Sequence, residues 1–95
     1  MKDLIISPAA ASDLTRIWYY TLEMWGRTQA DRYVGDISAT FEDVAAGRVV
    51  PKSAAVVRAG YVKVNVGRHV VFLKEFPERI EVVRVLHERM DVGRL

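Results

Sequence analysis

Cysteine is absent from this chain, and histidine occurs only twice, as His69 and His87. The lack of cysteine excludes disulfide bonds and thiolate metal ligands. Two histidines alone are too few for a typical zinc site, so we expect neither a metal nor another cofactor. No apolar run approaches the roughly 20 residues of a membrane-spanning helix, and Met1–Ile6 is too short for a signal peptide. We therefore expect a cytoplasmic protein with no membrane partner.

A strong excess of one charge is also lacking. The chain has 14 basic and 12 acidic residues, which leaves a formal net charge of +2 at pH 7. Nucleic-acid-binding domains usually show a stronger basic bias that is gathered in one patch, whereas the arginines of this chain are spread along its length. The composition therefore gives no reason to expect direct DNA binding by this chain alone.

The chain does contain enough apolar surface for one core. Hydrophobic residues make up 51% of its 95 residues, and charged residues make up 27%. A chain of this length buries roughly 60–65% of its unfolded surface, so it can fold alone with a thin margin of stability. We expect one domain over residues 1–95, with 92–95 as a candidate flexible tail.

The first half of the chain has the periodicity of two helices. Ser7–Pro8 combines an N-cap with proline at the first helical position and predicts a helix that runs to Trp25. Thr28 is expected to cap a second helix, which Gly47 ends. Because only residues 26–27 lie between them, the helices should form an antiparallel hairpin. The stripes expected to face the core are Leu14, Ile17, Trp18, Thr21, Leu22 and Trp25, and then Ala30, Tyr33, Val34, Ile37, Phe41, Val44 and Ala45.

The second half of the chain has the alternation of strands. A short apolar run at 4–6 predicts an N-terminal strand, and four further strands are expected at 54–58, 61–66, 69–75 and 80–87. Tight turns join the later strands, so neighbours should be antiparallel. The expected fold class is α+β: an N-terminal strand and an antiparallel helical hairpin packed on a mainly antiparallel sheet of four to five strands.

The last expected strand carries apolar residues on both faces. Simple alternation places Ile80, Val82, Arg84 and Leu86 on one face, and Glu81, Val83, Val85 and His87 on the other. The helices can cover only one face of the sheet. A partner, the connection at 48–53 or the C-terminal tail must therefore cover the other face. Arg84 and His87 could act together only if a bulge interrupts the strand.

The sequence resembles the RelE/ParE superfamily of type II toxin–antitoxin modules, and its ParE-like branch in particular. The resemblance covers about residues 3–91 and is carried, in this order, by SPAAASDLTRIWYY, WGRTQADRYVGDISATFEDVA, GYVKVNVGRHVVFLKEF and IEVVRVLHERMD. It implies a toxin that a ParD-like antitoxin holds inactive by direct binding, in a heterotetramer or larger complex. DNA binding is expected only with the antitoxin.

The resemblance leaves two activities to weigh. ParE-like members poison DNA gyrase, whereas RelE-like members cut messenger RNA on the ribosome, usually with basic residues of the sheet and a tyrosine or histidine near the C-terminus. Here His69 stands where an arginine is expected, and no tyrosine follows Tyr61. We therefore favour a gyrase-poisoning toxin and assign no catalytic residue. A RelE-like endoribonuclease, which His87 would suit, and a degenerate toxin that only binds antitoxin are the alternatives.

Site residues are assigned from this hypothesis. Those expected to contact the target lie at the C-terminal end of the last strand: Arg84, His87, Arg89 and Asp91. Those expected to contact the antitoxin are Tyr19, Tyr20, Val83 and Val85. The simplest structural roles are a strand-start residue beside the turn for His69 and a sheet-end residue with one hydrogen bond for His87.

Overall fold

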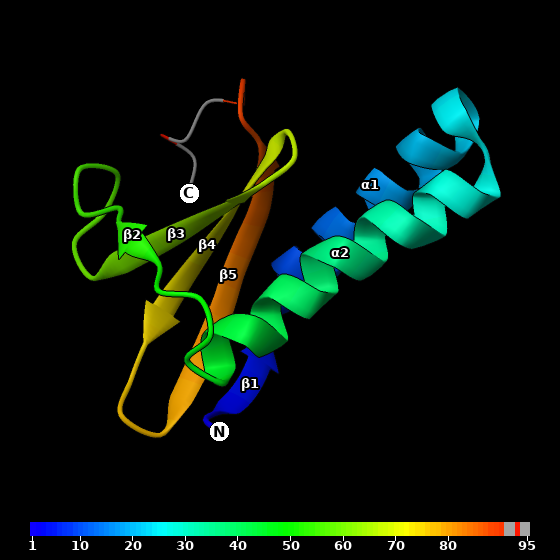
Figure 1. The fold of residues 1–95 in the computed structure, drawn as a ribbon. Helices are drawn as coiled ribbons and strands as arrows, with labels where there is room; N and C mark the ends of the chain where they lie inside the picture. The colour runs from blue at the N-terminus through cyan, green and yellow to red at the C-terminus, as the bar shows by residue number, and fades with distance from the viewer. Residues whose placement is uncertain (91–92, 94–95) are drawn as a thin grey trace.

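The computed structural model describes residues 1–90 and Gly93. Its elements, in chain order, are β1 (Asp3–Ile6), α1 (Pro8–Trp25), α2 (Arg27–Ala45), β2 (Lys52–Ser53), β3 (Tyr61–Val66), β4 (His69–Glu75) and β5 (Arg79–His87) (Figure 1). The predicted α+β fold with an N-terminal strand and a helical hairpin is confirmed. Apart from Gly93, the candidate tail at 92–95 lies outside the described residues. Among the described residues, neither helix is long and apolar enough to cross a membrane.

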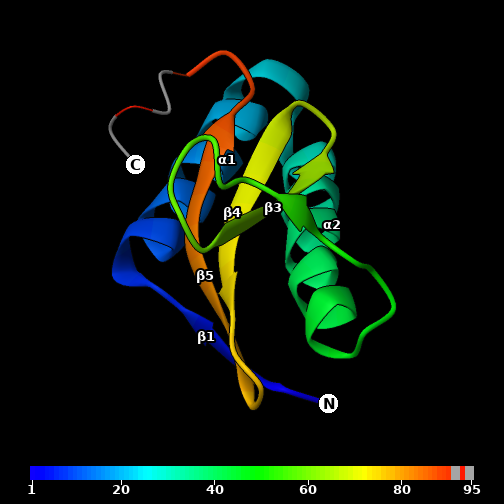
Figure 2. The same cartoon turned by 90° about the vertical axis from the view of Figure 1, so that its left-hand side faces the viewer.

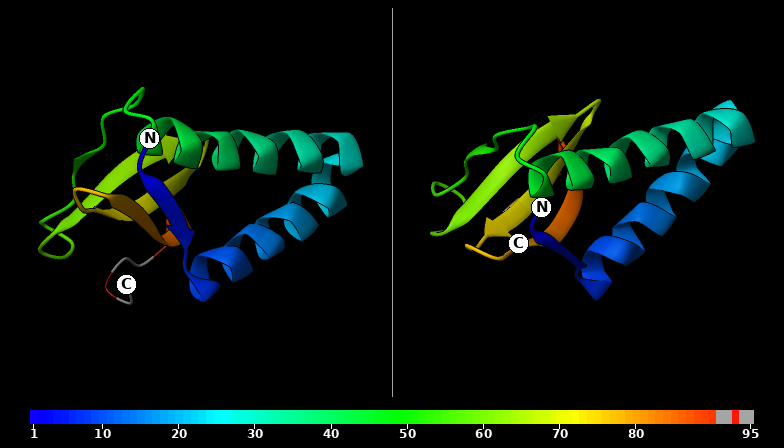
Figure 3. Two further views of the ribbon diagram at one scale, coloured as in Figure 1. Left: turned by 90° about the horizontal axis from the view of Figure 1, so that it is seen from below. Right: turned by 60° about the horizontal axis from the view of Figure 1, so that its bottom comes forward.

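The five strands form one mixed sheet in the order β1-β5-β4-β3-β2. β1 pairs with β5 in parallel, while β2 with β3, β3 with β4, and β4 with β5 are antiparallel. For β3, β4 and β5 the tight turns predicted this. Figure 2 shows the sheet with both helices behind it and the segment between β2 and β3 crossing its other face. The helices converge at Gly26 and separate toward the sheet, where β1 runs from the end of α2 to the start of α1 (Figure 3).

Both ends of α1 follow from the sequence. The Ser7 hydroxyl accepts a hydrogen bond from the backbone N–H of Ala10 at 3.0 Å, and Pro8 occupies the first helical position. Gly26 has a φ of +89°, which glycine adopts without strain, and it lies directly between the two helices. The expectation that Thr28 caps α2 is wrong, because α2 already begins at Arg27 and a single glycine reverses the chain.

The main core lies between the helices and one face of the sheet. The predicted stripe of α2 is confirmed: Ala30, Ile37, Phe41, Val44 and Ala45 are buried, and Tyr33 and Val34 pack against them. On α1 the prediction that Trp25 is a core residue is wrong, because its side chain is 72% exposed at the tip of the hairpin, which extends beyond the sheet (Figure 1). Trp18 is half-buried, and its indole N–H donates to Asp31 at 2.8 Å.

The strand predicted at 54–58 is wrong. These residues form a turn instead, in which the Ala54 carbonyl accepts hydrogen bonds from the N–H groups of Val57 and Arg58 at 2.9 and 3.1 Å. The edge strand β2 lies earlier, within the connection expected at 48–53. Ala54 and Val57 pack with Tyr61, Phe72 and Leu86 as a second, smaller apolar cluster. The chain itself therefore covers part of the sheet face that the helices leave open.

Candidate functional site

A β-bulge interrupts β5 beside the predicted target-binding residues. Phe72 of β4 pairs with Arg84, whereas the next residue of β4, Leu73, pairs with Val82. Among the described residues, Val83 is thus left without a cross-strand partner. An extra residue of this kind transfers every later side chain to the other face of the sheet. The alternation predicted for 80–87 is therefore wrong from Arg84 onward, whereas Val83 still lies on the face opposite Val82.

The bulge changes which side chains of β5 face the helices. Val85 now packs in the main core with Val82, and only 2% of it is exposed. Leu86 faces the opposite side of the sheet and packs with Phe72. The prediction that Val85 contacts the antitoxin requires an exposed side chain, and Val85 is almost completely buried. Val83 is half-buried against the second cluster.

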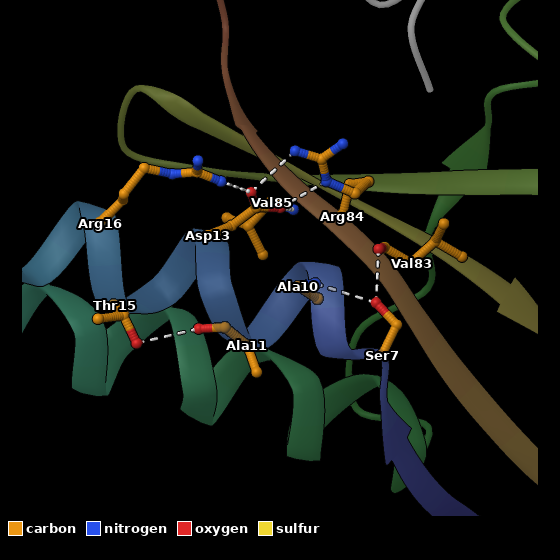
Figure 4. A network of polar contacts seen from close by, with 9 residues as sticks. All are labelled: Ser7, Ala10, Ala11, Asp13, Thr15, Arg16, Val83, Arg84 and Val85. Atoms are coloured by element: carbon orange, nitrogen blue, oxygen red, sulfur yellow. Dashed lines mark hydrogen bonds and ion pairs between the residues drawn. The ribbon is translucent and has the colours of Figure 1, made fainter.

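Asp13 of α1 holds the bulged part of β5 (Figure 4). One carboxylate oxygen accepts from Arg84 Nε at 2.8 Å and from the backbone N–H of Val85 at 2.9 Å. The other accepts from Arg84 Nη2 and from Arg16 Nη2, both at 2.9 Å. Burial acts to raise the pKa of Asp13, but the hydrogen bonds from Arg84, Val85 and Arg16 outweigh it and lower the pKa. Asp13 is therefore an ionised carboxylate at neutral pH, although only 3% of it is exposed.

Ser7 completes this junction between α1 and β5. β1 pairs with β5 up to Val82, whose carbonyl accepts the Ser7 N–H at 3.0 Å. The Ser7 hydroxyl then donates to the Val83 carbonyl at 2.8 Å. Together with the bond from Val85 to Asp13, these contacts satisfy backbone groups along the edge of β5 beyond β1.

The predicted exposed cluster of target contacts is only partly assembled. Arg84 is contradicted as a free surface cation, because its guanidinium is bound to Asp13 and its side chain is only 27% exposed. Arg89 is exposed, and His87 is half-buried. Asp91 lies outside the described residues.

The ends of β4 and β5 bring the two histidines together. His69 and His87 are directly opposite in the strand register, and their rings meet edge to face with centroids 5.3 Å apart. Burial lowers the pKa of His69, and His87 lowers it further, while Glu88 opposes the shift. His87 Nδ1 accepts from the backbone N–H of Arg89 at 3.1 Å, so the neutral ring carries its proton on Nε2.

The pairing of His69 with His87 was not predicted, although its signal was present in the sequence. One histidine begins one predicted strand, and the other ends the next. Antiparallel neighbours of this kind bring such positions face to face.

Tyr33 of α2 fixes the turn from which His69 emerges. Its hydroxyl hydrogen-bonds with His69 Nδ1 and accepts from the backbone N–H of Arg68 at 3.2 Å. Burial raises the pKa of this hydroxyl. Gly67 has a φ of +55°, and a Cβ there would lie 2.8 Å from Tyr33 Cε1. Glycine is therefore required both by the backbone conformation and by the close approach of the ring.

A cavity of about 420 Å³ opens between α1 and the ends of β4 and β5. Its walls are mostly apolar, and its polar groups come from both layers of the fold. The lining residues are Asp13, Arg16, Ile17, Tyr20, His69, Val85, His87 and Met90. The four residues from α1 recur at helical spacing and form one face of that helix. A larger depression of about 570 Å³ lies at the other end of the sheet, between the N-terminus, the end of α2 and the β4–β5 turn.

Exposed aromatic and apolar side chains extend from this cavity along α1. Tyr19 and Tyr20 are 59% and 64% exposed, and Met24 and Trp25 follow them toward the tip of the hairpin. Large exposed apolar groups that gather on one element are typical of protein-binding surfaces. The exposure expected of both tyrosines is thus present.

Comparisons with known proteins place these features in a family. Residues 4–92 match the family described as the ParE toxin of the type II toxin–antitoxin system, parDE. Toxin ParE1 of Mycobacterium tuberculosis (strain ATCC 25618 / H37Rv) is 38% identical over 91 residues, which cover 95% of this chain and 93% of that protein. Toxin ParE1 of Caulobacter vibrioides is 37% identical over 91 residues, covering 96% and 94%.

The fold is also similar to a solved structure described as the chromosomal ParDE TA system from P. aeruginosa. The TM-score is 0.77 at 18% sequence identity, and the match covers 92% of this chain and 96% of that one. The chain therefore belongs to the ParE toxin family of parDE type II toxin–antitoxin systems.

Proposed function

We propose that this chain stops growth by binding DNA gyrase in the cytoplasm, and that a ParD-like antitoxin neutralises it by direct binding. The observation that supports protein binding is the mostly apolar cavity beside α1, continued by exposed aromatic side chains on the same helix. Burial of such apolar surface by a protein side chain is favourable, because water is displaced from it.

A RelE-like ribonuclease is the second candidate, and the histidine pair is the observation that favours it. Cleavage by a 2′-hydroxyl needs a general base, a general acid and cations beside the phosphate. Two facing imidazoles could supply the first two groups. However, the guanidinium of Arg84 is bound to Asp13, and Ile17 and Val85 make the adjoining wall apolar. Arg16, Arg68 and Arg89 lie near the histidines, but the mostly apolar wall suits a protein side chain better than a phosphate, so protein binding remains the function that we propose.

The proposed antitoxin surface is the outer side of α1 around Tyr19 and Tyr20. Its exposed apolar groups could anchor an amphipathic segment of the antitoxin, with salt bridges at the rim. We propose the heterotetramer or larger complex on family likeness. Val83 is a lesser contact because it is half-buried, and Val85 is excluded from this surface by its burial.

Co-expression with the neighbouring reading frame tests the antitoxin proposal. We expect a stable complex with the unaltered chain and its loss with the double variant Tyr19→Ala/Tyr20→Ala. The matched control is Val50→Ala/Val56→Ala, which truncates two exposed apolar residues away from α1. Recovery of only free toxin in the presence of its neighbour, or equal loss of binding in both double variants, would reject the proposal.

Induction of the chain alone in cells tests the gyrase proposal. We expect DNA synthesis to fail first, with a DNA-damage response and filamentation. Prompt loss of protein synthesis with cut transcripts would instead establish the RelE-like activity. Unimpaired growth would establish a degenerate toxin.

A further inference from the structure

We propose that the cavity between α1 and the ends of β4 and β5 is the target-binding pocket, and that an acidic segment of the target protein fills it. That segment would place an apolar side chain in the cavity and a carboxylate at its rim. The inference rests on the proposed function and deepens it, because His87 lines this cavity and Arg89 directly precedes a second lining residue, Met90.

The apolar part of the pocket sets the first requirement for its occupant, an apolar side chain. Ile17 and Val85 are buried residues of the main core, while Tyr20 and Met90 lie at the mouth and are 64% and 55% exposed. The volume of about 420 Å³ falls in the range of small-molecule sites, and it is ample for one large side chain. A leucine or an aromatic side chain would therefore find apolar contact on several sides.

The histidines set the second requirement for the occupant, a hydrogen-bond acceptor. The proton of neutral His87 lies on Nε2, because Nδ1 accepts from the backbone of Arg89. His69 likewise engages its Nδ1, with the hydroxyl of Tyr33, so Nε2 is its remaining ring nitrogen. His87 thus offers a donor to the occupant, and the matching group is an oxygen that accepts a hydrogen bond.

Charge at the rim selects a carboxylate among such oxygens. Arg16 lines the cavity and, although it bonds Asp13, its side chain is 69% exposed, while Arg68 and Arg89 are exposed close to the histidines. Two described carboxylates lie near the cavity, and arginines engage both: Asp13 accepts four hydrogen bonds, and Glu88 pairs with Arg68 at 3.5 Å. Arg16, Arg68, Arg84 and Arg89 outnumber these two carboxylates, so the described rim keeps a net positive charge. A positive rim attracts an acidic segment and repels a basic one.

A pair of opposite charges at Met90 tests this inference, because the residue lies at the mouth and contributes little to the core. Met90→Asp should repel the carboxylate, so that about tenfold more induced protein is needed to arrest growth, whereas Met90→Lys should stay within about twofold of the unaltered chain. The matched controls are Val56→Asp and Val56→Lys, at a fully exposed residue outside the pocket, which should behave alike. Antitoxin co-purification and the melting temperature are measured for each variant.

Each outcome decides between support and rejection. Equal toxicity, or equal loss of toxicity, in both Met90 variants would overturn the inference. So would loss of antitoxin binding by a Met90→Asp protein that stays toxic, since the pocket would then belong to the antitoxin. Should Met90→Asp not fold, Arg16→Gln is compared with Arg32→Gln on α2, and only the former should lose toxicity. An unaltered chain without toxicity would overturn the proposed function too, whereas fully toxic pocket variants would overturn this inference alone.

Discussion

Asp13 joins α1 to β5 through a single buried carboxylate. It accepts hydrogen bonds from Arg84, Arg16 and the backbone of Val85. A buried ion pair of this kind contributes little relative to an apolar pair, but removal of one partner leaves the other charge uncompensated. The predicted toxic residue Arg84 is therefore better explained as part of the fold.

Replacement of this carboxylate should be costly. We expect Asp13→Asn to lower the free energy of unfolding by about 2–4 kcal/mol, because asparagine leaves the Arg84 guanidinium without an anion. Asp36→Asn on the exposed face of α2 is the control and should change stability by less than about 0.5 kcal/mol. Urea denaturation at pH 7 measures both.

The lowered pKa of Asp13 adds a pH dependence with a definite sign. A carboxylate whose folded-state pKa lies below its unfolded value stabilises the protein above about pH 4, and this contribution is lost as the pH falls further. The stability difference between the Asp13→Asn variant and the unaltered chain should therefore shrink in acid. A difference that is unchanged between pH 7 and pH 3 would contradict this role.

Two glycines should respond to alanine with opposite signs. Gly67→Ala should destabilise by about 1–3 kcal/mol, because φ is positive and Tyr33 occupies the space of the new methyl group. Gly35 is exposed in α2 with nothing near its Cβ position, so Gly35→Ala should stabilise by about 0.5–1 kcal/mol. Thermal unfolding of both variants checks this, and two shifts of the same sign would contradict it.

At the scale of elements, α2 and the β3–β4 turn are linked through Tyr33 and His69. Because burial and His87 lower the pKa of His69, the unfolded chain binds a proton more readily than the folded one. Stability should therefore decline as the pH falls from about 7 through the ordinary histidine pKa of about 6.5.

Substitution of His69 isolates this effect. We expect His69→Gln to lose less stability than the unaltered chain between pH 7.5 and pH 5.5, since glutamine does not titrate there. Urea midpoints at the two pH values provide the measurement. The same decline in both proteins would show that His69 is not the titrating group.

The helices were predictable because their signals are local. Ser7–Pro8 begins α1 and the apolar spacing of α2 marks its buried stripe, and both were confirmed. The true start of α2 was missed because one residue, Gly26, ends one helix and precedes the other. Ala54–Arg58 has apolar residues typical of a strand, but its hydrogen bonds close a turn that packs against the sheet.

The candidate site was less predictable because it depends on contacts distant in sequence. The bulge at Val83 appears only when β4 and β5 are paired, and it moves Val85 into the core. Trp25 lies on the predicted apolar stripe, yet it is exposed because the end of α1 extends beyond the sheet. Periodicity describes the faces of an element, but not how far its neighbours extend.

At the scale of the whole molecule, the helical hairpin extends from one end of the sheet and leaves a cavity at the junction. The turn at 54–60 packs on the other face of the sheet (Figure 2). Less of that face is therefore left for a partner to cover than the sequence suggested. On the proposed function, Tyr20 belongs to both the antitoxin surface and the mouth of the target pocket. An antitoxin bound to α1 would then obstruct the pocket directly.

We propose that this ParE-family chain acts by binding a protein, DNA gyrase, and not by cutting RNA. The most direct measurement adds the purified chain, free of antitoxin, to a gyrase supercoiling assay and, in parallel, to ribosomes that carry messenger RNA. We predict that supercoiling is blocked and that the transcripts stay intact. Unimpaired gyrase together with cleaved transcripts would contradict the proposed activity.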